Sequence, residues 1–112
     1  MPVKNHNTLI RDRVPELIVE SGGRAVTRVL SQQEFVQALK AKLVEEADAA
    51  SHAATPLELA LEIGDVLEVM DALIRAQGFQ HSEIDAYRHE RAASHGTFKQ
   101  RLLLLQTRTP DV

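Results

Sequence analysis

The chain has 112 residues, the size of a single domain, so we expect one domain over residues 1–112. It contains no cysteine, which excludes a disulfide framework, a thiolate nucleophile and a Cys-based zinc site. No apolar run approaches the roughly 20 residues of a membrane span, and the N-terminus has no apolar signal core, so we expect a cytoplasmic protein without a membrane partner.

The N-terminal part is predicted to start as a short extended segment and then form a short helix. Pro15 suits the first turn of that helix, and a Ser-Gly-Gly turn at 21–23 would end it. Arg11 is a candidate for contacts to phosphate groups, although an exposed ion pair is an equally good interpretation. Residues 24–30 are β-prone and predict either a single strand or an extended connector.

Two long helices are predicted in the middle of the chain. Ser31 and Glu34 form a capping box at the start of a helix over about residues 32–52. A second capping box, Thr55-Pro56-Leu57-Glu58, starts a helix over about residues 56–77, for which Gly78 is a plausible stop. With few aromatic residues, the core must come mainly from Leu, Ile, Val and Ala, which suits helices packed on helices.

The stretch from Leu43 to Ile74 carries eight carboxylates and no Lys or Arg. It contributes −8 to a net charge of −3, so the rest of the chain carries +5. Burying carboxylates beside apolar side chains costs several kcal/mol each unless a cation or a donor compensates. The eight acids are Glu45, Glu46, Asp48, Glu58, Glu62, Asp65, Glu68 and Asp71.

Helical geometry indicates which of these acids can meet. At 100° per residue, Glu46 projects from the apolar face of the first long helix, with Glu45 at its margin. Glu62 and Asp65 are three residues apart, so they are neighbours on the helix surface. They lie along one edge of a broad predicted core face that consists of Leu59, Ile63, Val66, Met70, Leu73 and Ile74. In a helical hairpin these acids can converge and hold Mg²⁺, with Mn²⁺ as a substitute. The competing interpretation is two acidic helix faces in water.

A last helix is predicted over about residues 83–95, with Ser82 as its N-cap and Asp85 at the capping-box position. Its exposed face carries Arg91, and a basic face in water is one interpretation of this residue. Lys99 follows a Gly-Thr-Phe turn and could add positive charge at the rim of a site. Because the dominant charge cluster is acidic, we expect no nucleic-acid partner.

Three segments, in this order, resemble the MazG-like all-α nucleoside triphosphate pyrophosphohydrolases, which include the phosphoribosyl-ATP pyrophosphohydrolases. Glu45-Glu46 followed by Glu62-Ile-Gly-Asp65 resembles the EExxE…ExxD signature. Residues 7–16 resemble the NKLIRDKIPE opening of one subgroup, and residues 91–98 resemble its KxxxRGGF segment. The resemblance covers nearly the whole chain.

The resemblance implies an all-α fold in which a helical hairpin is completed as a multi-helix bundle in a homodimer or a higher homo-oligomer. It implies Mg²⁺-dependent cleavage of a nucleoside triphosphate, or a related nucleotide, to monophosphate and pyrophosphate. We expect Glu46, Glu62 and Asp65 to hold the metal. Glu45 would act on the attacking water, and Arg91, together with Arg11 or Lys99, would bind the phosphates of the nucleotide substrate.

One position departs from the signature, because Ala49 stands where the last Glu of EExxE is expected. Asp48 is adjacent but rotated by about 100° around the helix, so it does not replace that Glu. Two alternatives therefore stay open beside the enzyme. One is a nucleotide-binding or regulatory module with weak or lost catalysis, and the other is a helical interaction protein with solvated acidic edges.

Overall fold

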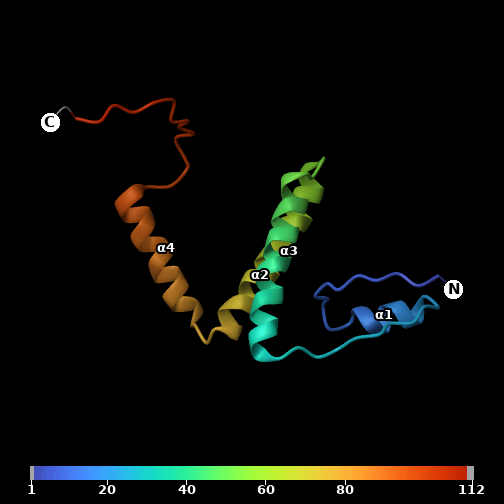
Figure 1. The fold of residues 1–112 in the computed structure, drawn as a ribbon. Helices are drawn as coiled ribbons and strands as arrows, with labels where there is room; N and C mark the ends of the chain where they lie inside the picture. Colours follow the sequence, from blue (N-terminus) through green and yellow to red (C-terminus); the bar gives the residue numbers. More distant parts are fainter. Residues whose placement is uncertain (1, 111–112) are drawn as a thin grey trace. The chain divides into compact units, whose positions relative to one another are not determined.

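The computed structural model describes residues 2–110, and within that range the protein is all-α, with four helices and no strand (Figure 1). The chain divides into two compact units, the first ending at Phe79 and the second beginning at Gln80. No helix of the described residues combines the length and the apolar character needed to cross a membrane. The helices are α1 (Val14–Glu20), α2 (Gln32–Ser51), α3 (Pro56–Ala76) and α4 (His81–His95).

The predicted short N-terminal helix is confirmed as α1, which has Pro15 in its first turn and ends before Ser21. Residues 2–11 precede it without regular secondary structure. The β-prone run at 24–30 also has no regular secondary structure, so the connector interpretation holds and the strand does not form. A lone strand there would have needed a neighbour for its backbone hydrogen bonds.

Both long helices begin at the predicted capping residues. The Ser31 hydroxyl accepts a hydrogen bond from the Glu34 backbone N–H at 3.2 Å, and the Glu34 carboxylate accepts one from the Ser31 N–H at 3.0 Å. At the start of α3, the Thr55 hydroxyl accepts from the backbone N–H of Glu58 at 3.1 Å. Gly78 follows the end of α3 with φ +76°, a left-handed conformation that glycine adopts without strain.

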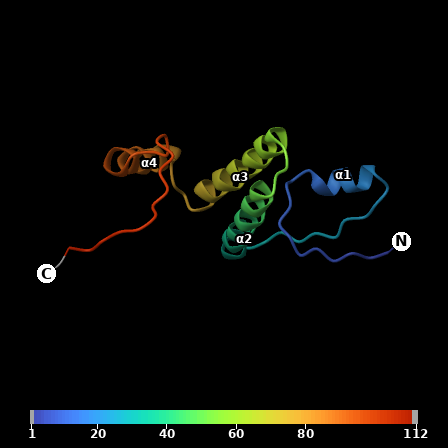
Figure 2. The ribbon, with the colours of Figure 1, turned by 90° about the horizontal axis from the view of Figure 1, so that it is seen from above.

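The two long helices form an antiparallel hairpin, and they lie side by side in both views (Figures 1 and 2). The Gln32 side-chain amide donates to the Ala76 carbonyl at 2.6 Å, which ties the start of α2 to the end of α3. Within the described residues, the buried apolar side chains are Val36 and Leu39 on α2 and Val69 on α3. This core is small, and several large apolar side chains of the hairpin stay exposed: Val44, Leu57, Leu59, Leu61, Ile63, Leu67 and Met70.

The contact face of α3 agrees with the predicted one in part, since Val66, Leu73 and Ile74 are half-buried. Ile63 and Met70 remain 47% and 39% exposed, whereas Val69 is buried against α2. A single partner helix covers only one side of a broad apolar face, and it covers the side that also carries Glu62 and Asp65. Four side chains at helical spacing stay exposed on α3 and are called here the α3 ridge: Leu59, Ile63, Leu67 and Met70.

The second unit contains α4, whose start differs from the prediction. The helix begins at His81 with Gln80 as its N-cap, so Ser82 lies within the first turn. The Glu83 carboxylate accepts from the Gln80 backbone N–H at 3.0 Å, which makes Glu83 rather than Asp85 the capping acid. After α4, residues 102–110 have no regular secondary structure, and Leu102 to Leu105 are exposed.

Candidate metal centre

The structure brings three carboxylates together between α2 and α3. Glu46, Glu62 and Asp65 each offer one oxygen atom, and these atoms all lie within 4.8 Å of one another. All three side chains are half-buried. Their convergence follows from helical spacing, since Glu46 is two turns after buried Leu39 and Glu62 is two turns before buried Val69.

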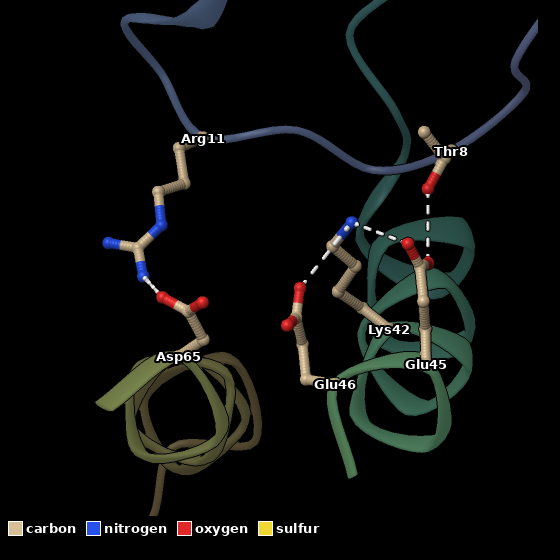
Figure 3. A network of polar contacts seen from close by, with 6 residues as sticks. All are labelled: Thr8, Arg11, Lys42, Glu45, Glu46 and Asp65. Atoms are coloured by element: carbon tan, nitrogen blue, oxygen red, sulfur yellow. Dashed lines mark hydrogen bonds and ion pairs between the residues drawn. The ribbon is translucent and has the colours of Figure 1, made fainter. Parts of the chain in front are cut away.

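Two cations from outside the stretch Leu43 to Ile74 contact carboxylates of this cluster (Figure 3). The Arg11 Nη2 atom donates to the Asp65 Oδ1 atom at 2.8 Å. The Lys42 Nζ atom lies 3.7 Å from the Glu46 Oε1 atom and 3.2 Å from the Glu45 Oε1 atom. Protein cations therefore supply part of the compensation that the sequence argument assigned to a metal ion.

Glu62 differs from its two neighbours in the cluster. Within residues 2–110, its carboxylate makes no hydrogen bond to protein and no ion pair, although the side chain is half-buried. Arg11 pairs with Asp65, and Lys42 is shared between Glu46 and Glu45, whereas Glu62 has neither cation as an ion-pair partner. An added divalent cation would gain most from this carboxylate, because no protein group has to be displaced from it.

The donor set fits Mg²⁺ or Mn²⁺, because these hard cations prefer carboxylate oxygens. With metal–oxygen distances near 2.1 Å, ligands around Mg²⁺ are about 3 Å apart when adjacent and about 4.2 Å apart when opposite. The oxygen atoms, spread over as much as 4.8 Å, need only a small inward movement to reach these separations. Side-chain rotation of half-buried carboxylates can provide it.

Glu45 lies beside the cluster rather than in it. Its Oε2 atom accepts from the Thr8 hydroxyl at 3.3 Å, and its Oε1 atom faces Lys42 at 3.2 Å (Figure 3). Ala49, one turn farther along α2, is half-buried and brings no oxygen. Glu58 is also absent from the cluster, since its carboxylate accepts from the Ala54 backbone N–H at 2.9 Å. Glu46 is therefore the one α2 residue in this three-carboxylate group.

The candidate phosphate-binding residues are placed in different surroundings. Arg11 is engaged with Asp65, and Arg13 pairs locally with Glu16 at 3.3 Å, so both form exposed ion pairs. Arg91 and Lys99 belong to the second unit, where both side chains are exposed. Arg91 borders an open depression on α4 together with Tyr87 and His95.

A cavity of about 480 Å³ lies between the N-terminal segment and α2. Residues 6–9 form one side, and Ala38, Ala41, Lys42 and Glu45 form the other. Sequence reasoning missed Lys42, although its spacing of three and four residues before Glu45 and Glu46 was a usable signal for helical ion pairs. No local pattern, by contrast, indicates the pairing of Arg11 with Asp65.

Comparisons with known proteins give one partial relative. No family model matches the chain, and no solved structure matches it. An uncharacterized protein of Mycolicibacterium smegmatis is 52% identical over 56 residues, which are 50% of this chain and 56% of that protein. The chain thus spans little more than half the length of the curated relative that it matches.

Proposed function

We propose that this protein is a divalent-cation-dependent nucleotide pyrophosphohydrolase of the MazG-like type. It would cleave a nucleoside triphosphate, or a related nucleotide, to the monophosphate and pyrophosphate. The observation that supports this proposal is the meeting of Glu46, Glu62 and Asp65, carboxylates from two facing helices, within 4.8 Å. The motif resemblance adds the substrate class and the reaction, which the geometry by itself does not specify.

The proposed roles follow from position and chemistry. Glu46, Glu62 and Asp65 hold Mg²⁺, which when bound offsets the negative charge of the phosphates in the transition state. Glu45 is adjacent to the cluster and exposed enough to accept a proton from the attacking water. The water oxygen forms a new bond to phosphorus as the bond between the α- and β-phosphates breaks. Arginine or lysine side chains, with Arg91, Arg11 and Lys99 as candidates, bind the phosphate oxygens.

A nucleotide-binding module with weak or lost catalysis is the second candidate. The observation that favours it is the single α2 carboxylate in the cluster, since Ala49 contributes none and Glu45 is turned toward Lys42 and Thr8. Fewer acidic ligands would hold the metal more weakly or hold one ion where two are needed. Tight nucleotide binding without release of pyrophosphate identifies this alternative.

We also propose that the protein is a homodimer or a higher homo-oligomer, located in the cytoplasm, in which further helices complete a multi-helix bundle. The supporting observation is the small core of the described residues, where the buried apolar side chains are Val36, Leu39 and Val69. The α3 ridge leaves apolar side chains in water over several turns. Covering the α3 ridge with another subunit would stabilise the assembly by about 25 cal/mol for each Å² of apolar surface removed from water.

The deciding experiment measures pyrophosphate release from a panel of canonical and modified nucleotides with Mg²⁺ or Mn²⁺. The control is the double variant Glu62→Gln/Asp65→Asn, which keeps side-chain size and removes two ligand charges. We expect metal-dependent release by the natural protein and only background release by the variant. An unchanged melting temperature with either metal, together with no release from any nucleotide, would instead favour a helical interaction protein.

A further inference from the structure

The N-terminal segment, defined here as residues 2–13, is attached to the hairpin through the carboxylates of the candidate metal centre and its neighbour. Arg11 donates to Asp65 on α3 at 2.8 Å, across 54 residues of sequence. Thr8 donates to Glu45 on α2 at 3.3 Å, across 37 residues. Figure 3 shows the segment passing over both helices, with these two side chains pointing down to the acids.

Little apolar packing supports this attachment. Residues 2–8 are exposed, and Leu9 is only half-buried. Residues 6–9 line one side of an open cavity of about 480 Å³ whose other side is α2. The position of the N-terminal segment therefore depends strongly on the polar contacts of Arg11 and Thr8.

Arg11 and a metal ion would share the Asp65 carboxylate. The guanidinium binds the Asp65 Oδ1 atom, so a divalent cation on this carboxylate would lie close to it. A guanidinium and a divalent cation on one carboxylate also repel each other. The ion pair is 62% exposed at Arg11 and 44% exposed at Asp65, so water screens it and it opens easily.

Lys42 stands in a different relation to the cluster. It lies on α2 itself, 20% exposed, and it is closer to Glu45 than to Glu46. Lys42 can therefore keep a carboxylate partner in Glu45 when a metal takes Glu46, and the helix holds it in place. Arg11 has no second acidic partner among its hydrogen bonds and ion pairs in the described residues, so its release leaves the Thr8–Glu45 hydrogen bond as the segment's remaining polar attachment.

We propose that Arg11 is a latch that competes with the divalent cation for Asp65, so that metal binding releases the N-terminal segment and frees Arg11 for the substrate phosphates. This inference rests on the proposed function, because it requires the carboxylate cluster to bind the metal. Binding of the metal and docking of the segment are then reciprocally coupled. The metal-free protein is latched, and the metal-loaded protein is open for a nucleotide.

The first test compares Mn²⁺ binding by the natural protein, Arg11→Ala and Arg13→Ala, using titration calorimetry or the electron paramagnetic resonance of free Mn²⁺. Removing the competitor should lower the Mn²⁺ dissociation constant of Arg11→Ala by up to about fivefold, the range expected for an exposed ion pair. Arg13→Ala is the matched control, because it removes the same charge from the same segment but its partner is the local Glu16. Its dissociation constant should stay near that of the natural protein.

The second test follows the NMR order parameters of the backbone amides of residues 7–12, with diamagnetic Mg²⁺ as the ligand. Saturating Mg²⁺ should lower the order parameters in this range in the natural protein while leaving the amides of the α2–α3 hairpin rigid. Metal-free Arg11→Ala should already show the low order parameters, and Mg²⁺ should change them little. This readout reports the mobility of the segment and does not require catalysis.

The outcomes separate the latch from the proposed function. Equal Mn²⁺ affinity in all three proteins, an equal gain in both arginine variants, or higher order parameters of residues 7–12 with Mg²⁺ would each overturn the latch while leaving the metal site intact. Absence of Mn²⁺ binding in both the natural protein and Arg11→Ala would overturn the metal site and the latch together.

Discussion

Glu46 on α2 and Asp65 on α3 present carboxylate oxygens within 4.8 Å of each other, and each has a different protein cation as a neighbour. Lys42 lies on the same helix as Glu46, whereas Arg11 comes from the N-terminal segment. Like charges at this separation repel, so positive charge close by lowers the cost of holding these acids side by side. Predictions about the site follow from changing one acid or one cation at a time.

Glu62 is the carboxylate whose replacement best isolates metal binding. Glu62→Gln should leave the melting temperature of the metal-free protein unchanged or slightly raised, because it removes like-charge repulsion without breaking a contact. It should abolish the stabilisation by metal, which for the natural protein at 100 times the dissociation constant is about 2.7 kcal/mol. The measurement is thermal unfolding with and without Mg²⁺ or Mn²⁺.

The matched control for that experiment is Glu68→Gln, which makes the same change on the same helix at an exposed position outside the cluster. It should keep the full metal-dependent shift. Loss of the shift in both variants would point to a general effect of helix charge, and persistence of the shift in Glu62→Gln would contradict the proposed ligand set.

Ala49→Glu tests the departure from the EExxE pattern. A glutamate three residues after Glu46 lies on the same side of α2, so it should add a carboxylate near the cluster. We expect tighter Mn²⁺ binding, by roughly tenfold or about 1.4 kcal/mol, and higher pyrophosphate release if catalysis was limited by the metal. Asp48→Glu is a useful comparison, because it extends a side chain on a different face of the helix. No gain from Ala49→Glu would count against this placement of the site.

The α3 ridge should control self-association. Ile63→Lys and Leu67→Lys each place a charge among apolar side chains that are 47% and 62% exposed in the described protein. We expect both variants to shift the mass measured by light scattering toward the monomer, because a lysine is costly to bury in an interface core. Val29→Lys is the control, since Val29 is 95% exposed and lies outside the helices. Unchanged mass in the ridge variants would place the interface elsewhere.

Acid sensitivity should be detectable at the start of α2. The Arg28 guanidinium makes two hydrogen bonds of 3.1 Å to the Glu34 carboxylate, and with the backbone N–H of Ser31 it lowers the pKa of Glu34 to about 2. Because this pKa is below the unfolded value of 4.5, the pair stabilises the folded state above about pH 4.5. That contribution is lost as the pH falls from about 4.5 to about 2.

Arg28→Met removes the main cause of this shift. The pKa of Glu34, followed by the carboxyl carbon shift in an NMR titration, should rise toward its ordinary value. The difference in stability between the natural protein and Arg28→Met should shrink as the pH falls through the same range. A pKa near 2 in the variant would mean that the helix start, rather than the guanidinium, holds the carboxylate ionised.

Local sequence patterns determined the helices. The capping residues Ser31 and Thr55, with Gly78 as a stop, predicted α2 and α3 to within one residue at each end, because such residues satisfy backbone groups that a helix end leaves free. The predicted box at Thr55 forms only in part, since the Glu58 carboxylate accepts from the Ala54 N–H. The start of α4 was predicted wrongly, since Gln80 and Glu83 perform the capping that Ser82 and Asp85 were expected to perform. Both starting points fit the local sequence, and the residues of a single helical turn do not indicate which one the helix uses.

Tertiary structure decided which charges meet. Helical spacing indicated that Glu46, Glu62 and Asp65 share a side of the hairpin, and the packing of Val69 on α2 turned that side inward. The pairing of Arg11 with Asp65 spans 54 residues and could not be predicted, because periodicity relates only residues of one element. An ion pair between distant segments depends on where the chain places both groups in space, and only the folded hairpin with its N-terminal segment specifies that.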